Sequence, residues 1–263
     1  MRPNKVKQIW KDGGYVTNGW LHIPSSWSAE IMAHCGFDSL VVDLQHGMMN
    51  FESSVSMFQA ISTTDTVPMA RIPWNEPGIA GKLLDAGAYG IICPMVNNQS
   101  ECEAFVGAVR YFPDGYRSRG PTRASVYGGS DYAEHANDEI IAMAMIETKE
   151  AVDNVTDIVS VPNLDAVYVG PGDLSLTLGC EKVGADIDEP IYMEAIDTIL
   201  AACKKAGVAA GIHTASPEYA RRMVEKGFQY ITLSTDTGIL RAKAKSMVNE
   251  FKGGDGTVKT SLY

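Results

Sequence analysis

The sequence has few cysteines and no long hydrophobic run, and each shortage excludes a class of protein. The cysteines are odd in number, widely scattered and never spaced as Cys-x-x-Cys: Cys35, Cys93, Cys102, Cys180 and Cys203. This pattern argues against a disulfide framework and is typical of reduced thiols. No apolar stretch approaches the roughly 20 residues needed to cross a bilayer, and the N-terminal segment lacks an apolar signal region. We therefore expect a cytoplasmic protein without a membrane partner.

Positive charge is also scarce. The chain has 22 Lys and Arg against 32 Asp and Glu, which gives a formal net charge of -10. Such a surface repels nucleic acid and acidic membranes, so neither is expected as the main partner. Hydrophobic residues at 45% and the lack of any low-complexity tract indicate a globular protein with a sizeable core.

Short apolar runs alternate with amphipathic segments along the chain. The runs are candidate strands at residues 17–23, 40–43, 68–72, 90–94, 140–146, 166–169, 209–212 and 230–233. The segments between them are candidate helices at residues 28–35, 51–62, 78–86, 100–110, 148–159, 192–206 and 217–226. Eight such βα units favour an α/β fold, a (β/α)₈ TIM barrel that uses residues 1–263 as a single domain. An open doubly wound sheet is the structural alternative.

Residues 111–137 form the one long segment without a clear pattern, so we expect an irregular functional loop or an intersubunit element there. Its arginines interleave with tyrosines, which superficially resembles a nucleic-acid patch: Arg110, Arg117, Arg119 and Arg123. In an acidic protein, anchoring of the loop or a subunit contact is the better interpretation.

Two acidic residues stand where apolar runs end. Glu147 follows Ala-Met-Ile, and Asp173 follows Gly-Pro-Gly. In a parallel α/β fold the carboxyl ends of the strands carry the site, so the two carboxylates meet there. Without cysteine or histidine at ligand spacing, they suit Mg²⁺ or Mn²⁺ better than structural Zn²⁺. The alternative is that Glu147 caps a helix and Asp173 is a helix N-cap.

The same reasoning gathers further polar residues at that end of the barrel: Asp43, His46, Arg71, His213 and Asp236. Arg71 ends an apolar run, so it favours stabilisation of an oxyanion over a surface salt bridge. His46 is a candidate base, with a structural histidine as the alternative. His213 is expected to line the pocket. No lysine ends a candidate strand, which argues against Schiff-base chemistry.

The turn from Gly170 to Asp173 has a second capacity. Glycines between a strand and a helix expose backbone N–H groups at the positive end of that helix, where a substrate carboxylate can bind. The alternative is a tight turn that only needs glycine.

Several motifs occur together in a fixed order. They are Val-Val-Asp-Leu-Gln-His-Gly at 41–47, Ala-Arg-Ile-Pro-Trp-Asn at 70–75, Leu-Leu-Asp-Ala-Gly-Ala-Tyr-Gly-Ile-Ile-Cys-Pro-Met-Val at 83–96, Arg-Ser-Arg-Gly-Pro-Thr-Arg-Ala at 117–124, Met-Ile-Glu-Thr at 145–148 and Val-Gly-Pro-Gly-Asp-Leu-Ser at 169–175. Together they resemble the metal-dependent class II pyruvate aldolases, the family of 4-hydroxy-2-oxoheptanedioate aldolase and 2-dehydro-3-deoxyglucarate aldolase.

The resemblance implies a barrel related to phosphoenolpyruvate-binding enzymes, usually a hexamer built as a trimer of dimers with an exchanged C-terminal helix. It implies that Glu147 and Asp173 bind the metal, which is Mg²⁺ or Mn²⁺ with Co²⁺ as a further candidate. It also implies a role for Gly172 at the pyruvyl carboxylate and for Arg71 at the enolate oxygen. The remaining implied roles concern the base: His46 removes the proton, directly or through a metal-bound water, and Asp85 raises its basicity from across a subunit interface. Asp43, beside His46 at its strand end, is a further catalytic candidate.

This chain departs from many members at two positions, carrying Gln45 in place of Glu and Met145 in place of a Gln that contacts substrate. Trp20 and His213 are expected to line the aldehyde pocket. The expected reaction is reversible cleavage of a 4-hydroxy-2-oxo acid to pyruvate, or a close 2-oxo acid, and an aldehyde. The alternatives are a related carbon-carbon lyase acting on oxaloacetate or an acyl-CoA, and a non-catalytic barrel that binds a 2-oxo acid.

Overall fold

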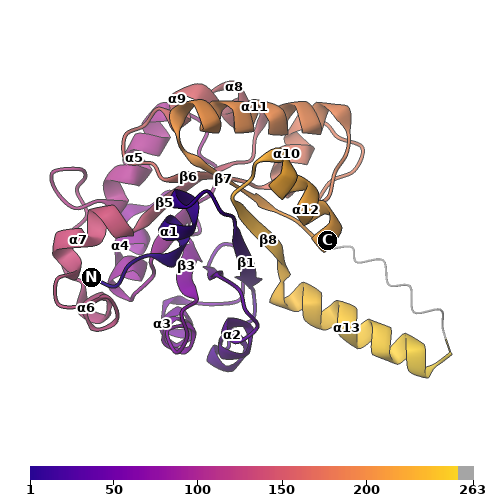
Figure 1. The fold of residues 1–263 in the computed structure, drawn as a ribbon, viewed down its shortest axis with the longest axis horizontal. Helices are drawn as coiled ribbons and strands as arrows, with labels where there is room; N and C mark the ends of the chain where they lie inside the picture. Colours follow the sequence, from indigo (N-terminus) through magenta and orange to yellow (C-terminus); the bar gives the residue numbers. More distant parts are fainter. Residues whose placement is uncertain (254–263) are drawn as a thin grey trace.

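A closed barrel of eight parallel strands forms the centre of the molecule (Figure 1). The structure is a computed structural model and describes residues 1–253. In chain order the strands are β1 (Val16–Leu21), β2 (Ser39–Asp43), β3 (Val67–Arg71), β4 (Gly90–Cys93), β5 (Ile141–Ile146), β6 (Ala166–Val169), β7 (Ala209–His213) and β8 (Tyr230–Thr235). Each strand pairs with the next, and β8 pairs with β1 to close the barrel. The predicted (β/α)₈ barrel is confirmed, and the open sheet is wrong.

Helices surround the strands as an outer layer (Figure 1). They are α1 (Lys5–Lys11), α2 (Ser26–Ala33), α3 (Phe51–Ile61), α4 (Pro77–Asp85), α5 (Gln99–Val109), α6 (Thr122–Gly128), α7 (Tyr132–Glu139), α8 (Lys149–Asp153), α9 (Val155–Val159), α10 (Pro171–Leu178), α11 (Pro190–Ala206), α12 (Pro217–Lys226) and α13 (Asp236–Phe251). None of the helices within residues 1–253 is long and apolar enough to cross a membrane.

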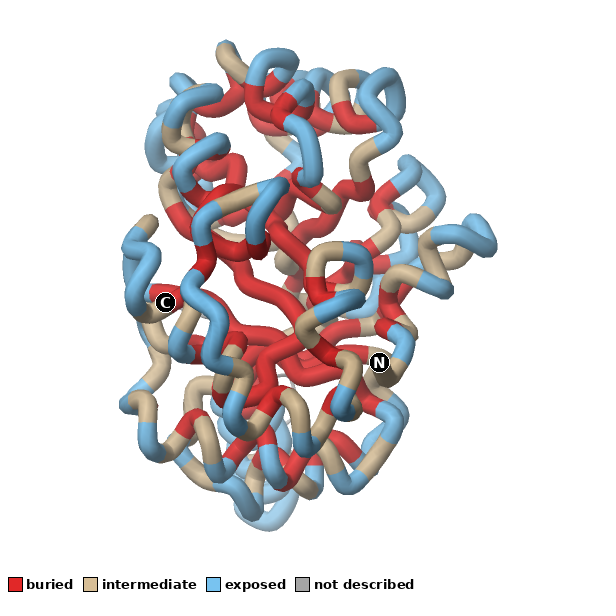
Figure 2. Tube along the Cα trace, turned by 90° about the vertical axis from the view of Figure 1, so that its left-hand side faces the viewer, coloured by how far each residue is buried: buried red, intermediate tan, exposed pale blue. Residues whose placement is uncertain are grey.

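The strands are buried on both faces, as Figure 2 shows by the red segments through the middle of the molecule. Every residue of β2 to β6 is buried. Strands covered by helices outside and by side chains inside read as continuous apolar runs, which is why the sequence predicted all eight. One hydrophobic cluster contains the core of the described chain. A single domain over residues 1–263 stays a prediction, because residues 254–263 lie outside the described part.

One helix prediction and the expectation of an irregular segment were wrong in detail. The segment 148–159 forms two short helices, α8 and α9, because Asn154 leaves helical geometry at φ -99° and ψ 7°. Its side-chain amide donates to the carbonyl of Asn97 at 2.9 Å, which holds the break in place. Residues 111–137 are not irregular throughout, since they include α6 and most of α7.

Arginines tie this segment to the barrel. The guanidinium of Arg110 donates to the carbonyl of Ile140 at 2.6 Å, and that of Arg117 to the Asp85 carboxylate at 2.7 Å. Arg123 donates to the carbonyl of Ala86 at 2.8 Å. The interpretation of these three arginines as anchors is confirmed.

Helix α13 extends away from the barrel (Figure 1). Large apolar side chains along it are exposed, and Phe251 at its end is 91% exposed. The others are Ile239, Leu240, Met247 and Val248. In the described chain this helix therefore offers an apolar surface that the barrel does not cover.

Candidate active site

A cavity of about 540 Å³ opens at the carboxyl ends of the strands. Its lining comes from nearly every side of the barrel, from the helix α13 and from the loop after α10. The lining residues are Trp20, His22, His46, Arg71, Met145, Glu147, Tyr168, Gly170, Pro171, Gly172, Asp173, Leu176, Val183, Gly184, Ala185, His213, Thr235, Thr237 and Arg241. The polar residues predicted from strand ends are thus brought together, with the exceptions described below.

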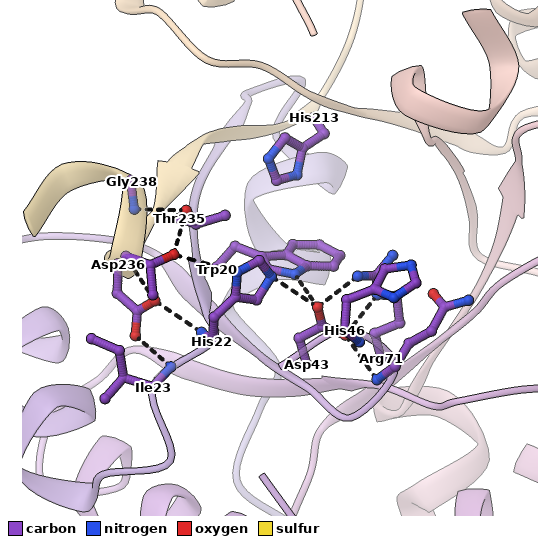
Figure 3. Close-up of polar contacts among 12 residues, drawn as sticks. Trp20, His22, Ile23, Asp43, His46, Arg71, His213, Thr235, Asp236 and Gly238 are labelled. Atoms are coloured by element: carbon purple, nitrogen blue, oxygen red, sulfur yellow. Dashed lines mark hydrogen bonds and ion pairs between the residues drawn. The ribbon is translucent and has the colours of Figure 1, made fainter. Parts of the chain in front are cut away.

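Asp43 lies at the end of β2 and is fully buried beneath this cavity. Its two oxygens accept hydrogen bonds from Arg71 Nε (2.8 Å) and Nη2 (2.6 Å), and Oδ2 also lies 3.1 Å from Trp20 Nε1 and 3.0 Å from His22 Nε2. Figure 3 shows these contacts converging on the carboxylate. Burial favours the neutral acid, but the hydrogen bonds from His22 and Arg71 prevail and hold the pKa of Asp43 well below its usual range.

Asp43 therefore positions its neighbours and does not line the cavity. A catalytic role in contact with substrate, as expected from its strand-end position, does not fit this geometry. Both its oxygens are occupied, because the backbone N–H of Gln45 also donates to Oδ1 at 3.0 Å.

Arg71 is held in a fixed orientation with one edge directed to the cavity. Its Nε and Nη2 bind Asp43, and the guanidinium lies 4.9 Å from the ring of Trp20. The paired carboxylate keeps the pKa of Arg71 raised despite burial. Nη1 donates no hydrogen bond to any residue within 1–253, so its N–H groups are available to donate to a ligand. A surface salt bridge, the alternative considered from sequence, is excluded by its 8% exposure.

His46 follows β2 and is an exposed residue at the cavity wall. Its backbone N–H donates to Asp43 Oδ1 at 3.3 Å, which fixes the loop that carries the ring. Burial, followed by the positive charge of Arg71, lowers the pKa of His46 below its ordinary value. The imidazole is therefore neutral at physiological pH, the form a general base requires.

Glu147 lies directly after β5 and is 2% exposed. Its Oε1 accepts a hydrogen bond from the Met95 N–H at 2.7 Å. A Cβ at Gly170 would lie 2.4 Å from Oε2, so glycine is required beside this oxygen. Burial raises the pKa of Glu147 to about 7, and the nearby charge of Asp173 adds to that effect.

The helix-cap alternatives for the acidic pair are wrong. The N-cap of α8 is Thr148, whose hydroxyl accepts from the Ala151 N–H at 3.0 Å. Asp173 lies in the first turn of α10, whose N-cap is Gly170. Both carboxylates instead line the cavity.

The acidic pair fits an oxygen-preferring divalent cation. A buried carboxylate with a raised pKa is stabilised in its charged form by a cation, and Asp173, on the helix that follows the neighbouring strand β6, would supply a second oxygen ligand. No third His, Cys, Asp or Glu completes a ligand group among residues 1–253. Two protein ligands leave positions for water and substrate oxygens, as Mg²⁺ or Mn²⁺ prefers.

Two predicted acidic residues are elsewhere. Asp236 is buried at the start of α13, where it accepts from the N–H groups of His22 (2.9 Å) and Ile23 (3.1 Å), so its expected place in the cavity is wrong (Figure 3). A carboxylate there satisfies the loop that follows β1. Asp85 lies at the end of α4, where its carboxylate accepts a hydrogen bond from Arg117, and it does not line this cavity. Its role across a subunit interface stays a prediction.

Trp20, Met145, Gly172 and His213 line the cavity as expected. Gln45 does not line it, and its buried Oε1 accepts no hydrogen bond from the described residues.

The sequence prediction missed one wall of the cavity: His22, Tyr168, Thr235, Thr237 and Arg241. His22 follows β1 in the same way that His46 follows β2, so the strand-end rule could have found it. Tyr168 lies inside β6, and Arg241 lies on a helix that was not predicted, so no comparable signal marked them.

Comparison with known proteins identifies the family of the chain. Residues 19–242 match the family model described as HpcH/HpaI aldolase/citrate lyase. A hydroxypyruvate/pyruvate aldolase from Rhizorhabdus wittichii is 38% identical, covering 93% of this chain and 97% of that protein. A 4-hydroxy-2-oxo-heptane-1,7-dioate aldolase from Escherichia coli is 34% identical over 99% of both chains.

Solved structures lead to the same family. The crystal structure of an HpcH/HpaI aldolase/citrate lyase family protein from Burkholderia cenocepacia superimposes with a TM-score of 0.88 at 32% identity, covering 95% of this chain and 99% of that chain. Fold and sequence agree over nearly the whole length. The chain therefore belongs to the HpcH/HpaI aldolase/citrate lyase family.

Proposed function

We propose that the protein catalyses metal-dependent, reversible aldol cleavage of a 4-hydroxy-2-oxo acid to pyruvate, or a close 2-oxo acid such as hydroxypyruvate, and an aldehyde. The observation that carries the proposal is the meeting of the buried Glu147 carboxylate and the exposed Asp173 carboxylate with a fixed guanidinium and a neutral histidine in one cavity. Cleavage of the C3–C4 bond needs these three capacities together: a cation site, an oxyanion donor and a base.

Glu147 and Asp173 would hold the metal, which we propose to be Mg²⁺ or Mn²⁺ with Co²⁺ as a further candidate. When bound, the cation supplies Lewis acidity at the 2-oxo group. The first backbone N–H groups of α10, at Gly172 and Asp173, lie at the positive end of that helix and would bind the substrate carboxylate.

Arg71 would donate through Nη1 to the oxygen on which negative charge develops during cleavage. Its other donors are occupied by Asp43, so the guanidinium needs no rearrangement when that charge appears. The ring of Trp20 further restricts its position.

His46 would remove the proton of the C4 hydroxyl. Its lowered pKa keeps Nδ1 or Nε2 unprotonated, and its ring lies on the same cavity wall as Arg71. No lysine occurs among the described residues that line the cavity, so the site offers no amine for a Schiff base.

We further propose that the enzyme works as an oligomer of identical chains, a hexamer in which α13 packs on a neighbouring subunit. The exposed apolar side chains of α13 support this, because such a surface needs a covering partner. Asp85 would then reach the His46 of another chain. Light scattering of the purified protein tests the assembly, and a monomer at micromolar concentration would contradict it.

The function is tested by pyruvate release from a panel of 4-hydroxy-2-oxo acids and oxaloacetate, using chelator-treated protein before and after addition of each metal. Cleavage restored by metal supports the proposal. Activity confined to oxaloacetate would identify a decarboxylase-like lyase, and silence with every metal would favour a non-catalytic binding protein.

The matched variants are Glu147→Ala and Glu150→Ala. Glu150 lies nearby on α8 but is exposed, so its loss should leave turnover intact. Glu147→Ala should lose turnover while retaining the fold. Equal turnover in the two variants would contradict the assignment of Glu147.

A further inference from the structure

Met95, in the loop after β4, has a backbone conformation that methionine rarely adopts. Its φ is 55°, which lies in the left-handed region. Within residues 1–253 the other non-glycine residues with such a backbone are Asn163 and Asp186, whose short polar side chains are compatible with it. Methionine has no polar side chain to favour this conformation, so the surrounding structure must hold Met95 in it.

The backbone of Met95 donates to the proposed metal ligand. Its N–H binds Glu147 Oε1 at 2.7 Å. The second oxygen of Glu147, Oε2, lies next to Gly170, which lines the cavity. A carboxylate that binds a metal is oriented by the hydrogen bonds it accepts. The strained loop therefore fixes one oxygen of Glu147 and leaves the other at the cavity for a cation.

The side chain of Asn97 connects the Met95 loop to the segment after β5. Its Nδ2 donates to the Met95 carbonyl at 3.1 Å, and its Oδ1 accepts from the Thr148 hydroxyl at 2.5 Å. A carbonyl only accepts, so the amide has a single possible orientation. Thr148 directly follows Glu147 in the chain. Asn97 is thus linked to Glu147 twice, through the Met95 N–H and through the backbone of Thr148.

The backbone of Asn97 is fixed as well. Its N–H donates to Glu101 Oε2 at 2.7 Å, and its carbonyl accepts from Asn154 Nδ2 at 2.9 Å. Asn97 is half-buried, and neither it nor Met95 lines the cavity. An effect of Asn97 on a ligand in the cavity must therefore pass through Glu147.

We propose that Asn97 is a positioning residue for the metal ligand Glu147, a role that rests on the metal site of the proposed function. Asn97 holds Met95 in the left-handed conformation, which keeps the Met95 N–H on Oε1 of Glu147. The carboxylate is then oriented before a cation arrives, so binding costs less rearrangement than it would with a free side chain.

The first test measures Mn²⁺ affinity by electron paramagnetic resonance, which detects the free ion and needs no turnover. Asn97→Ala should weaken the affinity roughly 10- to 100-fold, the usual effect of removing a group that orients a metal ligand. The matched control is Asn154→Ala, which removes a hydrogen bond to the same loop but none to Met95 or Thr148. Both variants should lower the midpoint of chemical denaturation, and only Asn97→Ala should lower the Mn²⁺ affinity.

The second test changes the backbone preference of residue 95 and leaves Asn97 in place. Glycine adopts the left-handed conformation without strain, so Met95→Gly should keep the wild-type Mn²⁺ affinity. Valine is β-branched and is strongly disfavoured in that conformation, so Met95→Val should weaken the affinity as Asn97→Ala does. Circular dichroism confirms that each variant is folded before titration. Equal affinities in the glycine and valine variants would overturn the role of the left-handed backbone.

The outcomes separate this role from the proposed function. A wild type that binds Mn²⁺, together with a folded Asn97→Ala variant of equal affinity, would overturn the role of Asn97 alone. If Asn97→Ala does not fold, the two Met95 variants decide. A wild type that binds no Mn²⁺ would overturn the proposed metal site and the role of Asn97 with it. Pyruvate release from the same samples tests the aldolase function separately, because the affinities do not depend on turnover.

Discussion

Two arginine–aspartate pairs, each with a buried arginine, lie at opposite ends of the barrel and serve different purposes. Arg71 and Asp43 stand at the carboxyl ends of β3 and β2. Arg110 and Asp165 stand at the amino end, where Asp165 directly precedes β6. Both arginines are nearly inaccessible, at 8% and 1% exposure.

The difference is in the remaining donors. Arg110 uses both terminal nitrogens on the protein itself: Nη1 binds the carbonyl of Ile140 at 2.6 Å, and Nη2 binds the carbonyl of Asn163 at 2.7 Å besides Asp165. Arg71 hydrogen-bonds only to Asp43 among the described residues, through Nε and Nη2, and its Nη1 donates to none of them. The ion pair is structural where the protein binds both terminal nitrogens and functional where one of them is left for a ligand, in line with the division of labour between the two ends of such barrels.

The largest effect should follow removal of the structural arginine. Arg110→Met leaves the half-buried Asp165 with only Lys7 as a cationic partner and leaves two buried carbonyls without donors, so unfolding free energy should fall by about 2 to 4 kcal/mol. Turnover per folded molecule should stay at the wild-type level. Chemical denaturation and a steady-state assay measure the two quantities. The double variant with Asp165→Asn should recover part of the loss; no recovery would mean that the charge of Asp165 is not the cause.

Arg71→Lys should show the reverse pattern. A lysine keeps the charge beside Asp43 but cannot bind it through two nitrogens and also reach the substrate, so kcat should fall roughly 10² to 10³-fold. Unfolding free energy should change far less than in the Arg110 variant. Chemical denaturation measures the unfolding free energy of this variant, and a steady-state assay measures its kcat. If the Arg71 variant loses stability but keeps kcat, Arg71 has a structural role like that of Arg110 and no role in catalysis.

A buried acid without an arginine partner should titrate instead of staying charged. Burial raises the pKa of Glu147 to about 7, so below that pH a metal must displace a proton from it. Affinity for Mn²⁺ should therefore weaken roughly tenfold per pH unit below about 7 and level off above it. Isothermal titration calorimetry in buffers of different ionisation enthalpy would detect the released proton. Equal affinity at pH 5.5 and pH 7 would contradict the raised pKa.

The smallest effect should come from an exposed pair. Lys149 and Asp153 lie one helical turn apart on α8 at 2.6 Å, with both side chains about 60% exposed. Lys149→Ala should change the unfolding free energy by less than about 0.5 kcal/mol, because water screens the charges. Chemical denaturation in low and high salt measures this change in unfolding free energy. A loss of unfolding free energy as large as that of the Arg110 variant would show that burial does not determine how much an ion pair stabilises this protein.

The fold was predictable because each strand is a buried apolar run that ends in a turn, and the order of such runs determines the barrel. Helices were less predictable where they lack an apolar stripe of their own. Helix α7 has only Tyr132 and Ala136 buried, and α13 has almost no buried residue. Their formation depends on contacts that the local sequence does not record.

Site residues were predictable where a polar side chain ends an apolar strand, as at Arg71 and Glu147. The rule could not distinguish a side chain that enters the cavity from one that lies beneath it. Asp43 and Asp236 stand at the same level as the others but turn toward protein donors, since a buried carboxylate takes whichever N–H groups are nearest.

The contact between Asp236 and the loop after β1 joins the beginning of the chain to its end. Thr235, Thr237 and Arg241, within the last thirty residues of the sequence, complete the cavity beside His22. During synthesis the chain emerges at about 5 to 20 residues per second, N-terminal part first. The ribosome must therefore make the chain through Arg241 before this cavity can assemble, so a chain that ends before α13 lacks a complete cavity even when most of its barrel has been made.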